Sequence, residues 1–274
     1  QIGLAELWKI HGVRPAGVVG HSTGEAAAQY LAGTLTFEDA IKVIYHRSRL
    51  QQRATGTGRM LAVGLSSETL QKSVRQFNDK VSIAAVNSPS AVTVSGETVV
   101  LETMAEQLDT FDVFHKFLDV EIPYHSYRMD PLREELLESL VGLRGLSSTI
   151  PLYSTVTGTR IDGANVDAHY WWQNVRTSVM FAAAFEQMLA DGYTHFVEIG
   201  PHPVLSSSMA EILQHVDASA VVMASLRRDE DDQDFFYRSL GSLHCHGIAL
   251  PWVNYFCDDI PIADLPRYPC LLYT

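Results

Sequence analysis

Apolar and polar residues in the N-terminal part of the chain recur with periods that predict helices around a short strand. Helical spacing of apolar residues predicts a helix over 2–10, and a β-branched run at 16–19 predicts a buried strand. Good helix formers at 25–32 predict a helix directly after that strand. An amphipathic helix is expected over 37–53, with Thr36 as its N-cap. This order is typical of α/β proteins.

The pattern changes after the glycine-rich break at 55–58. Strand and helix periods then alternate in the order β-α-β-β-α-β, which is that of a ferredoxin-like unit. We therefore expect a small subdomain, 57–122, inserted between two parts of a larger one, 1–56 and 123–250. The predicted strands of the small subdomain are 59–65, 81–86, 91–95 and 113–120, and its predicted helices are 67–77 and 97–110.

The C-terminal half returns to alternating strands and helices and belongs to the larger subdomain. The acidic run at 229–234 predicts a solvated loop and the start of a helix. After residue 251 the prolines and mixed composition predict a linker or tail, 251–274. The predicted strands are 151–154, 195–199 and 220–226, and the predicted helices are 129–140, 181–189, 204–215 and 235–245.

Composition excludes several classes of protein. The 274 residues, 46% apolar with a mean hydropathy of +0.01, predict a globular protein with a sizeable core. A net charge of −12 argues against a general nucleic-acid binder. No apolar run reaches the roughly 18 to 20 residues that a membrane helix needs, and no signal-peptide pattern is present. We expect a cytoplasmic protein with neither a membrane nor a nucleic acid as partner.

The cysteines and histidines do not form a metal-binding pattern. Cys245, Cys257 and Cys270 are odd in number and lie late in the chain, which favours reduced thiols. The stretch 244–246 reads His-Cys-His, but adjacent residues on a helix point in different directions and no second pair has ligand spacing. No metal is expected.

Gly20-His21-Ser22-Thr23-Gly24 stands between the strand at 16–19 and the helix at 25–32. Gly-x-Ser-x-Gly between a strand and a helix is the pattern of a nucleophile elbow, in which a sharp turn presents a serine for acyl transfer. We expect glycine on both flanks because a Cβ there would collide with the backbone. A chance match in a loop is the alternative, and the flanking strand and helix favour the nucleophile.

Arg47 falls on the apolar side of the helix at 37–53, with Val43 and Leu50. A buried cation is costly unless it meets an anion. Periodicity alone slightly favours a neighbouring acidic side chain as its partner over a carboxylate ligand that enters a cavity.

A serine nucleophile needs a base, and histidine is the usual one. Composition cannot choose among the eleven histidines. His21 is adjacent to Ser22, but neighbouring side chains across a tight turn usually diverge. His125 follows Pro123 at the exit of the inserted unit, where the chain returns to the larger subdomain. A core histidine without a catalytic role remains an equal alternative for His125 at this point.

Five landmarks occur along the chain: Gly20–Glu25, Arg47, Asn87-Ser88-Pro89, Tyr124-His125-Ser126 and Glu198–His202. Their order resembles that of the malonyl-CoA:acyl-carrier-protein transacylase family, and most closely the acyltransferase domain of a type I polyketide synthase. The resemblance runs from about residue 1 to 250. It implies an α/β-hydrolase-like large subdomain with a ferredoxin-like insertion.

The resemblance also implies roles for individual residues. Ser22 is expected to take the acyl group from coenzyme A, with His125 as its base. The family orients this histidine with a backbone carbonyl, and the matching position is Asn174. The backbone amide of Thr23 would supply an oxyanion donor, and His21 would line the acyl pocket.

Arg47 would pair with the free carboxylate of a malonyl or methylmalonyl group, since a guanidinium binds carboxylates bidentately. The resemblance thus favours a ligand for this arginine. It implies no permanently bound cofactor: coenzyme A arrives as the thioester substrate, and phosphopantetheine is carried by the partner acyl carrier protein. An adjacent ketosynthase and linker of the same polypeptide are further expected partners.

The chain departs from the family pattern in three places. The family begins with a Gly-Gln-Gly segment that supplies a second oxyanion donor, and none precedes residue 1, so we expect an N-terminally truncated fragment. The stretch 265–269 resembles the linker that follows such domains, but Cys270 stands directly after it in place of the expected tryptophan. Ile122-Pro123-Tyr124-His125 matches neither the malonyl-selective nor the methylmalonyl-selective signature, and we expect malonyl.

Two other functions remain as alternatives. A serine hydrolase such as a thioesterase normally has its histidine late, after an acidic partner, which the position of His125 disfavours. A non-catalytic piece that only docks neighbouring domains or carrier protein is the second alternative. The truncation keeps it open, although Ser22, His125 and Arg47 are all present.

Overall fold

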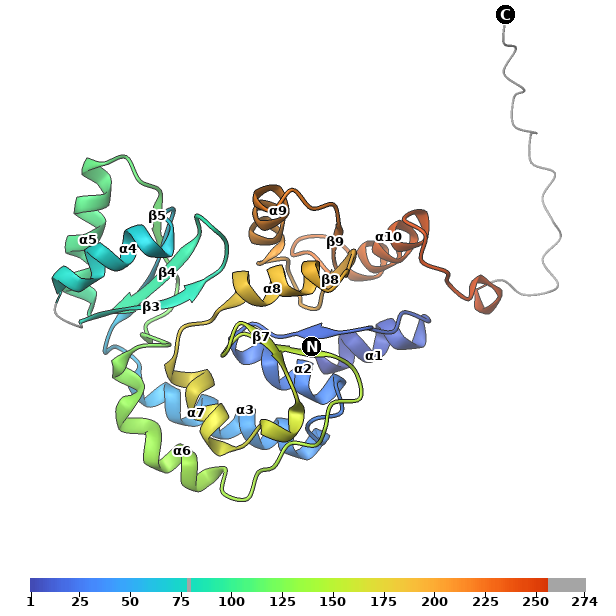
Figure 1. Cartoon of the computed structure of the whole chain (residues 1–274), viewed down its shortest axis with the longest axis horizontal. Coiled ribbons are helices and arrows are strands. Elements are labelled where there is room, and N and C mark those ends of the chain that lie inside the picture. Colours follow the sequence, from blue (N-terminus) through green and yellow to red (C-terminus); the bar gives the residue numbers. More distant parts are fainter. Residues whose placement is uncertain (78–79, 256–274) are drawn as a thin grey trace, which may run out of the picture.

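The computed structural model describes residues 1–77 and 80–255 (Figure 1). The elements around the predicted elbow follow the expected order: α1 (Ile2–Ile10), β1 (Val18–Val19), α2 (Glu25–Leu31) and α3 (Phe37–Gln51). The Thr36 side chain accepts a hydrogen bond from the amide of Asp39, which caps α3 as the sequence predicts.

Two small sheets form the strand layer of the large subdomain. β1 pairs in parallel with β6 (Leu152–Ser154), and β6 pairs antiparallel with β7 (Thr159–Ile161), a strand that the sequence pattern did not predict. β8 (His195–Glu198) pairs in parallel with β9 (Val221–Ala224) in a separate sheet. The helices that follow the strands in the second half are α8 (Phe181–Ala190), α9 (Ser206–His215) and α10 (Asp232–Cys245).

The small subdomain forms one four-stranded sheet with the predicted topology. Its strands β2 (Arg59–Val63), β3 (Val81–Val86), β4 (Val92–Gly96) and β5 (His115–Phe117) lie in the antiparallel order β3-β4-β2-β5. Together with α4 (Ser67–Val74) and α5 (Thr98–Thr110), this order is the ferredoxin-like arrangement. Leu61, Leu70, Val94 and Leu101 are each 0% exposed, so the sheet and both helices share one core.

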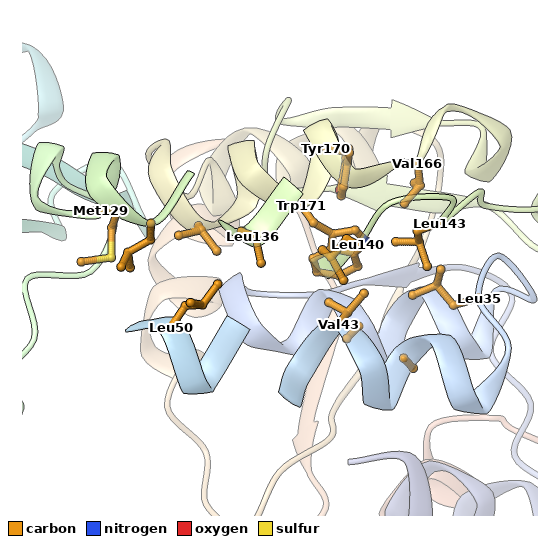
Figure 2. Packing of buried hydrophobic residues seen from close by; sticks show 14 of the residues in the cluster. Leu35, Val43, Leu50, Met129, Leu136, Leu140, Leu143, Val166, Tyr170 and Trp171 are labelled. Atoms are coloured by element: carbon orange, nitrogen blue, oxygen red, sulfur yellow. The ribbon is translucent and has the colours of Figure 1, made fainter. Parts of the chain in front are cut away.

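A second core fixes α3, the helix that carries Arg47. Val43 and Leu50 of α3 pack against side chains from a 3₁₀ helix (Tyr127–Leu132), α6 (Arg133–Ser139) and α7 (Ala168–Arg176) (Figure 2). Trp171 of α7 lies at the centre of this cluster and is 1% exposed. Close packing on this side leaves Arg47 no freedom to turn away from the elbow.

The two subdomains are joined along one seam of backbone hydrogen bonds. The amide of Val86 donates to the carbonyl of Val179 over 2.9 Å, and the amide of Val179 donates to the carbonyl of Ala84 over 2.9 Å. The segment before α8 therefore extends the edge of β3. This seam places the residues near 177 beside the turn at which the small subdomain ends.

The tail predicted at 251–274 lies mostly outside the described residues, as do Cys257 and Cys270. In the described part of this tail, a short 3₁₀ helix (Trp252–Asn254) packs Trp252 against the core around α10. The subdomain boundaries 1–56, 57–122 and 123–250 stay predictions. Within the described residues, no helix combines the length and apolarity required to cross a membrane.

Candidate active site

The turn between β1 and α2 has the geometry of a nucleophile elbow. Ser22 has a φ of 52°, in the left-handed region that a serine rarely adopts. A Cβ on Gly20 would lie 2.4 Å from the Cα and amide nitrogen of Glu25, so only glycine fits there. The expectation for Gly24 is wrong: a Cβ would meet only the side chain of Gln1, at 3.4 Å, which is an ordinary contact. The tight side of the turn is the one before the serine.

His125 lies against Ser22 although the two are far apart in sequence. Its Nε2 is 2.7 Å from Ser22 Oγ, and the histidine is 4% exposed. Its Nδ1 is 2.9 Å from the carbonyl oxygen of Thr177, which can only accept, so Nδ1 carries the proton. Nε2 is then free to accept the proton of Ser22. The turn at His125 has a φ of 57°.

The carbonyl that orients His125 belongs to Thr177, which corrects the assignment to Asn174. Asn174 is the last but two residue of α7, and its side-chain amide donates to the carbonyl of Ser22 over 3.2 Å. It therefore contacts the elbow and not the histidine. Thr177 follows α7 directly, at the C-cap, where the chain turns towards the seam with the small subdomain. No local pattern marks this carbonyl.

The surroundings of His125 keep its imidazole neutral. Burial, followed by the charges of Arg47 and His21, lowers the pKa of His125 from 6.5 to about 3. The hydrogen bond to Thr177 opposes this shift but does not cancel it. A neutral histidine with its lone pair at Nε2 is the form that can remove the proton of a serine.

Arg47 reaches the nucleophile from α3. Its Nη2 donates to Ser22 Oγ over 2.9 Å, its Nη1 donates to Thr23 Oγ1, and the residue is 3% exposed. Burial lowers the pKa of Arg47 from 12.5 to about 10, against the opposing charge of Glu25. The guanidinium keeps its charge at neutral pH.

No acidic side chain among the described residues forms an ion pair with Arg47. Its Nε is buried and has no partner within the part of the chain that the structure describes. The sequence periodicity slightly favoured a neighbouring acidic side chain as the partner of Arg47, and that preference is wrong. A buried guanidinium with an unused donor is suited to a carboxylate that comes from outside.

Glu25 is the nearest candidate for such an acid, but its oxygens are engaged elsewhere. Oε1 accepts from the amide of Thr155 over 2.7 Å, and Oε2 accepts from the hydroxyl of Tyr170. The Thr155 hydroxyl lies 2.9 Å from the carbonyl of Gly20. Burial raises the pKa of Glu25, although these hydrogen bonds oppose it. Glu25 fixes the elbow from beneath, a role that sequence reasoning missed.

His21 lies on the other flank of Ser22 and is held differently from His125. Its Nε2 donates to Asn87 Oδ1 over 2.8 Å, and its ring packs against Phe181 with the centroids 5.7 Å apart. Burial lowers the pKa of His21, and the bond to Asn87 opposes the shift. Nε2 of His21 is thus engaged with Asn87, whereas Nε2 of His125 lies against Ser22 Oγ.

These side chains share one cavity of about 1320 Å³. Ser22, Thr23, Arg47 and His125 line it at one end, with His21 and Asn87 beside them. The cavity continues between β1 and β8, which both contribute to its wall. Among the described residues, no group of His, Cys, Asp and Glu side chains could hold a metal ion. The arrangement can perform nucleophilic acyl chemistry on a ligand that carries a negative charge.

Comparison with known proteins identifies the class. The family model of the acyl transferase domain matches residues 1–250, so the chain belongs to this family. It is 43% identical over 269 residues to polyketide synthase GfsB of Streptomyces halstedii, and 39% identical over 271 residues to erythronolide synthase EryA2 of Saccharopolyspora erythraea. Each match covers 98% of this chain but only 5% and 8% of those relatives, respectively.

Solved structures agree with this assignment. The acyltransferase domain from module 8 of the salinomycin polyketide synthase matches with a TM-score of 0.90 at 34% identity, over 92% of this chain and 60% of that one. The malonyl CoA-acyl carrier protein transacylase from Clostridium perfringens matches with a TM-score of 0.79 at 25% identity, over 89% and 76%. The predicted α/β fold with a small ferredoxin-like subdomain is confirmed, and the chain is an acyltransferase domain of the polyketide synthase type.

Proposed function

We propose that this domain moves a malonyl or methylmalonyl group from coenzyme A to the phosphopantetheine thiol of an acyl carrier protein, through an ester on Ser22. The observation that supports it most is the environment of Ser22 Oγ. This oxygen lies 2.7 Å from a neutral imidazole nitrogen and 2.9 Å from a buried guanidinium nitrogen, in one cavity. A base for the serine and a cation for a substrate carboxylate are thus adjacent.

In the first half-reaction, Ser22 Oγ attacks the thioester carbonyl carbon while His125 Nε2 takes the hydroxyl proton. The carbonyl oxygen becomes an oxyanion, and the backbone amide of Thr23, the residue after the nucleophile, would stabilise it. The C–S bond then breaks, and His125 gives its proton to the sulfur of coenzyme A. The product is an O-malonyl ester of Ser22 and a free thiol.

The second half-reaction repeats these steps with another thiol. His125 removes the proton from the phosphopantetheine thiol, whose sulfur attacks the ester carbonyl. When the C–O bond breaks, the proton returns to Ser22 Oγ. Thr177 holds the ring throughout, because its carbonyl accepts from Nδ1–H and stabilises the imidazolium that forms at each step.

Arg47 is expected to change partners when the substrate enters. Its Nη2 now donates to Ser22 Oγ, and its Nε has no partner among the described residues. A malonyl carboxylate would accept two parallel hydrogen bonds from the guanidinium and neutralise its charge. Since the charge of Arg47 helps to lower the pKa of His125, substrate binding would raise that pKa and improve the base.

Mass spectrometry of the intact chain after incubation with malonyl-CoA tests the proposal. We expect a mass increase of one malonyl group on Ser22, its loss on addition of carrier protein that bears phosphopantetheine, and no increase in Ser22→Ala. Release of free malonate without carrier protein would instead indicate a serine hydrolase. An unlabelled parent chain, indistinguishable from Ser22→Ala, would indicate a docking piece without transferase activity.

A further inference from the structure

Glu211 of α9 binds the small subdomain across the seam. Its Oε2 accepts from the hydroxyl of Ser88 over 2.6 Å, and its Oε1 accepts from the amide and hydroxyl of Ser90 over 2.8 and 2.6 Å. Three donors from one turn thus converge on a single carboxylate. Figure 1 shows the β3–β4 hairpin that carries this turn directed towards α8 and α9.

The same turn carries Asn87, the residue that holds His21. The amides of Asn87 and Ser88 both donate to the carbonyl of Ala91, over 2.9 and 3.2 Å, so the turn is internally fixed. Ser88 is 0% exposed, and Ser90 is on the solvent side. A rigid turn transmits displacement at one end to the other. The position of Asn87 against His21 therefore depends on where Glu211 holds Ser88 and Ser90.

The carboxylate form is the one that can make all three bonds. Burial raises the pKa of Glu211, but the hydrogen bonds from Ser88 and Ser90 outweigh it, so the pKa lies below its ordinary value. An ionised carboxylate accepts through both oxygens, whereas the nitrogen of a glutamine amide cannot accept. Glu211→Gln therefore leaves at least one of the three donors without an acceptor.

We propose that Glu211 is a positioning residue of the acyl cavity: it fixes the 87–90 turn so that Asn87 holds the ring of His21 at the cavity wall. This role rests on the proposed acyl transfer for its functional consequence, but not for its structural part. Glu211 itself does not line the cavity, and it acts through Asn87 and His21 alone.

Nuclear magnetic resonance of the histidine side chains tests the structural part without any turnover. The His21 signals are assigned in the full chain by their loss in His21→Gln. We expect Glu211→Gln to shift the ¹⁵N resonances of the His21 ring. In an Asn87→Ala background, which already lacks the hydrogen bond between Asn87 and His21, Glu211→Gln should shift no His21 resonance. An unchanged His21 signal in Glu211→Gln, or the same shift in both backgrounds, would overturn the proposal.

Kinetics of malonyl transfer test the functional part. The net loss of one ordinary hydrogen bond predicts a rise in KM for malonyl-CoA of about fivefold, with little change in kcat. Glu135→Gln is the matched control, because Glu135 also accepts from two side chains, Arg49 of α3 and Arg53 of the 3₁₀ turn after it, but does not touch the 87–90 turn. It should leave KM unchanged. A fall in kcat alone, or an equal effect in the control, would contradict a positioning role.

A parent chain without transferase activity would refute the proposed function and leave the resonance experiment decisive for Glu211. Conversely, an active parent with an unshifted His21 signal would refute the role of Glu211 alone. The two failures are therefore distinguishable.

Discussion

The two walls of the acyl cavity around Ser22 are built in different ways. The elbow side, formed by Ser22, Thr23 and Arg47, comes from one continuous strand–turn–helix–helix segment. The seam side is formed by Asn87 and His125, and Thr177 holds the histidine through its carbonyl. These residues come from three segments that meet where the small subdomain joins the large one. Local sequence fixes the first wall, whereas the second depends on how two subdomains pair. We therefore expect single substitutions near Ser22 to disrupt the elbow side. The seam side should be disrupted by changes that shift the two subdomains relative to each other.

The largest effect is expected from Arg47→Ala on the elbow side. Loss of the guanidinium removes the proposed partner of a malonyl carboxylate, which should reduce malonyl transfer by a factor on the order of 10²–10³. Transfer of an uncharged acetyl group should be tolerated better, since it leaves no carboxylate unpaired. Parallel assays with radiolabelled malonyl-CoA or acetyl-CoA and carrier protein give the ratio of malonyl to acetyl transfer in the variant and in the parent.

The control for this change is Arg49→Ala, which lies on the same helix but is exposed and pairs with Glu135. It should alter neither substrate. Malonyl transfer at the full rate in Arg47→Ala would show that this arginine has another role, such as holding Ser22 Oγ in place.

The contrast between the two walls also explains how far the sequence could predict them. Ser22, Thr23 and Arg47 carry short-range signals: Gly-x-Ser-x-Gly between strand and helix, and a cation on an apolar helical face. The ferredoxin-like order was likewise readable, since each strand and helix shows its own period. His125 could be predicted as the base only from the resemblance to a family, because composition does not distinguish one of the eleven histidines from another.

The rest could not be predicted, because it depends on backbone atoms and register. Thr177 contributes a carbonyl, which every residue has, and its place follows from the pairing of Val179 with the edge of β3. Asn174 is nearby in sequence, but its side chain extends from α7 to the carbonyl of Ser22 in the elbow and not to His125. The strand β7 is only Thr159–Ile161, of which the first two residues are exposed, so no apolar period marks it.

A smaller effect should separate the two glycines of the elbow. Gly20→Ala places a Cβ 2.4 Å from the backbone of Glu25, and such overpacking costs about 1–3 kcal/mol. Gly24→Ala meets only a side chain at 3.4 Å and should leave the free energy of unfolding almost unchanged. Urea denaturation followed by circular dichroism measures both. Equal destabilisation by the two substitutions would mean that the turn is not tightest before the serine.

A further effect concerns His125 and the pH dependence of stability. Burial, Arg47 and His21 lower the pKa of His125 to about 3 in the native state, while the unfolded chain has the ordinary value of 6.5. Between these values the unfolded state binds a proton that the native state does not. His125 therefore makes its full contribution to the free energy of unfolding above pH 6.5, and this contribution is lost as the pH falls towards 3. The loss is about 1.4 kcal/mol per pH unit.

Other groups titrate in the same range, above all His21, with a lowered pKa, and Glu25, with a raised one. The difference between the parent and His125→Gln isolates His125, since glutamine fills a similar volume and does not titrate. Urea unfolding at pH 7 and pH 5 should therefore show a smaller loss of stability in His125→Gln than in the parent. An identical loss would mean that the native pKa of His125 equals its value in the unfolded chain, so that burial, Arg47 and His21 do not lower it. The seam side would then not keep the imidazole neutral at pH 5, and the acid–base role proposed for His125 would be confined to higher pH.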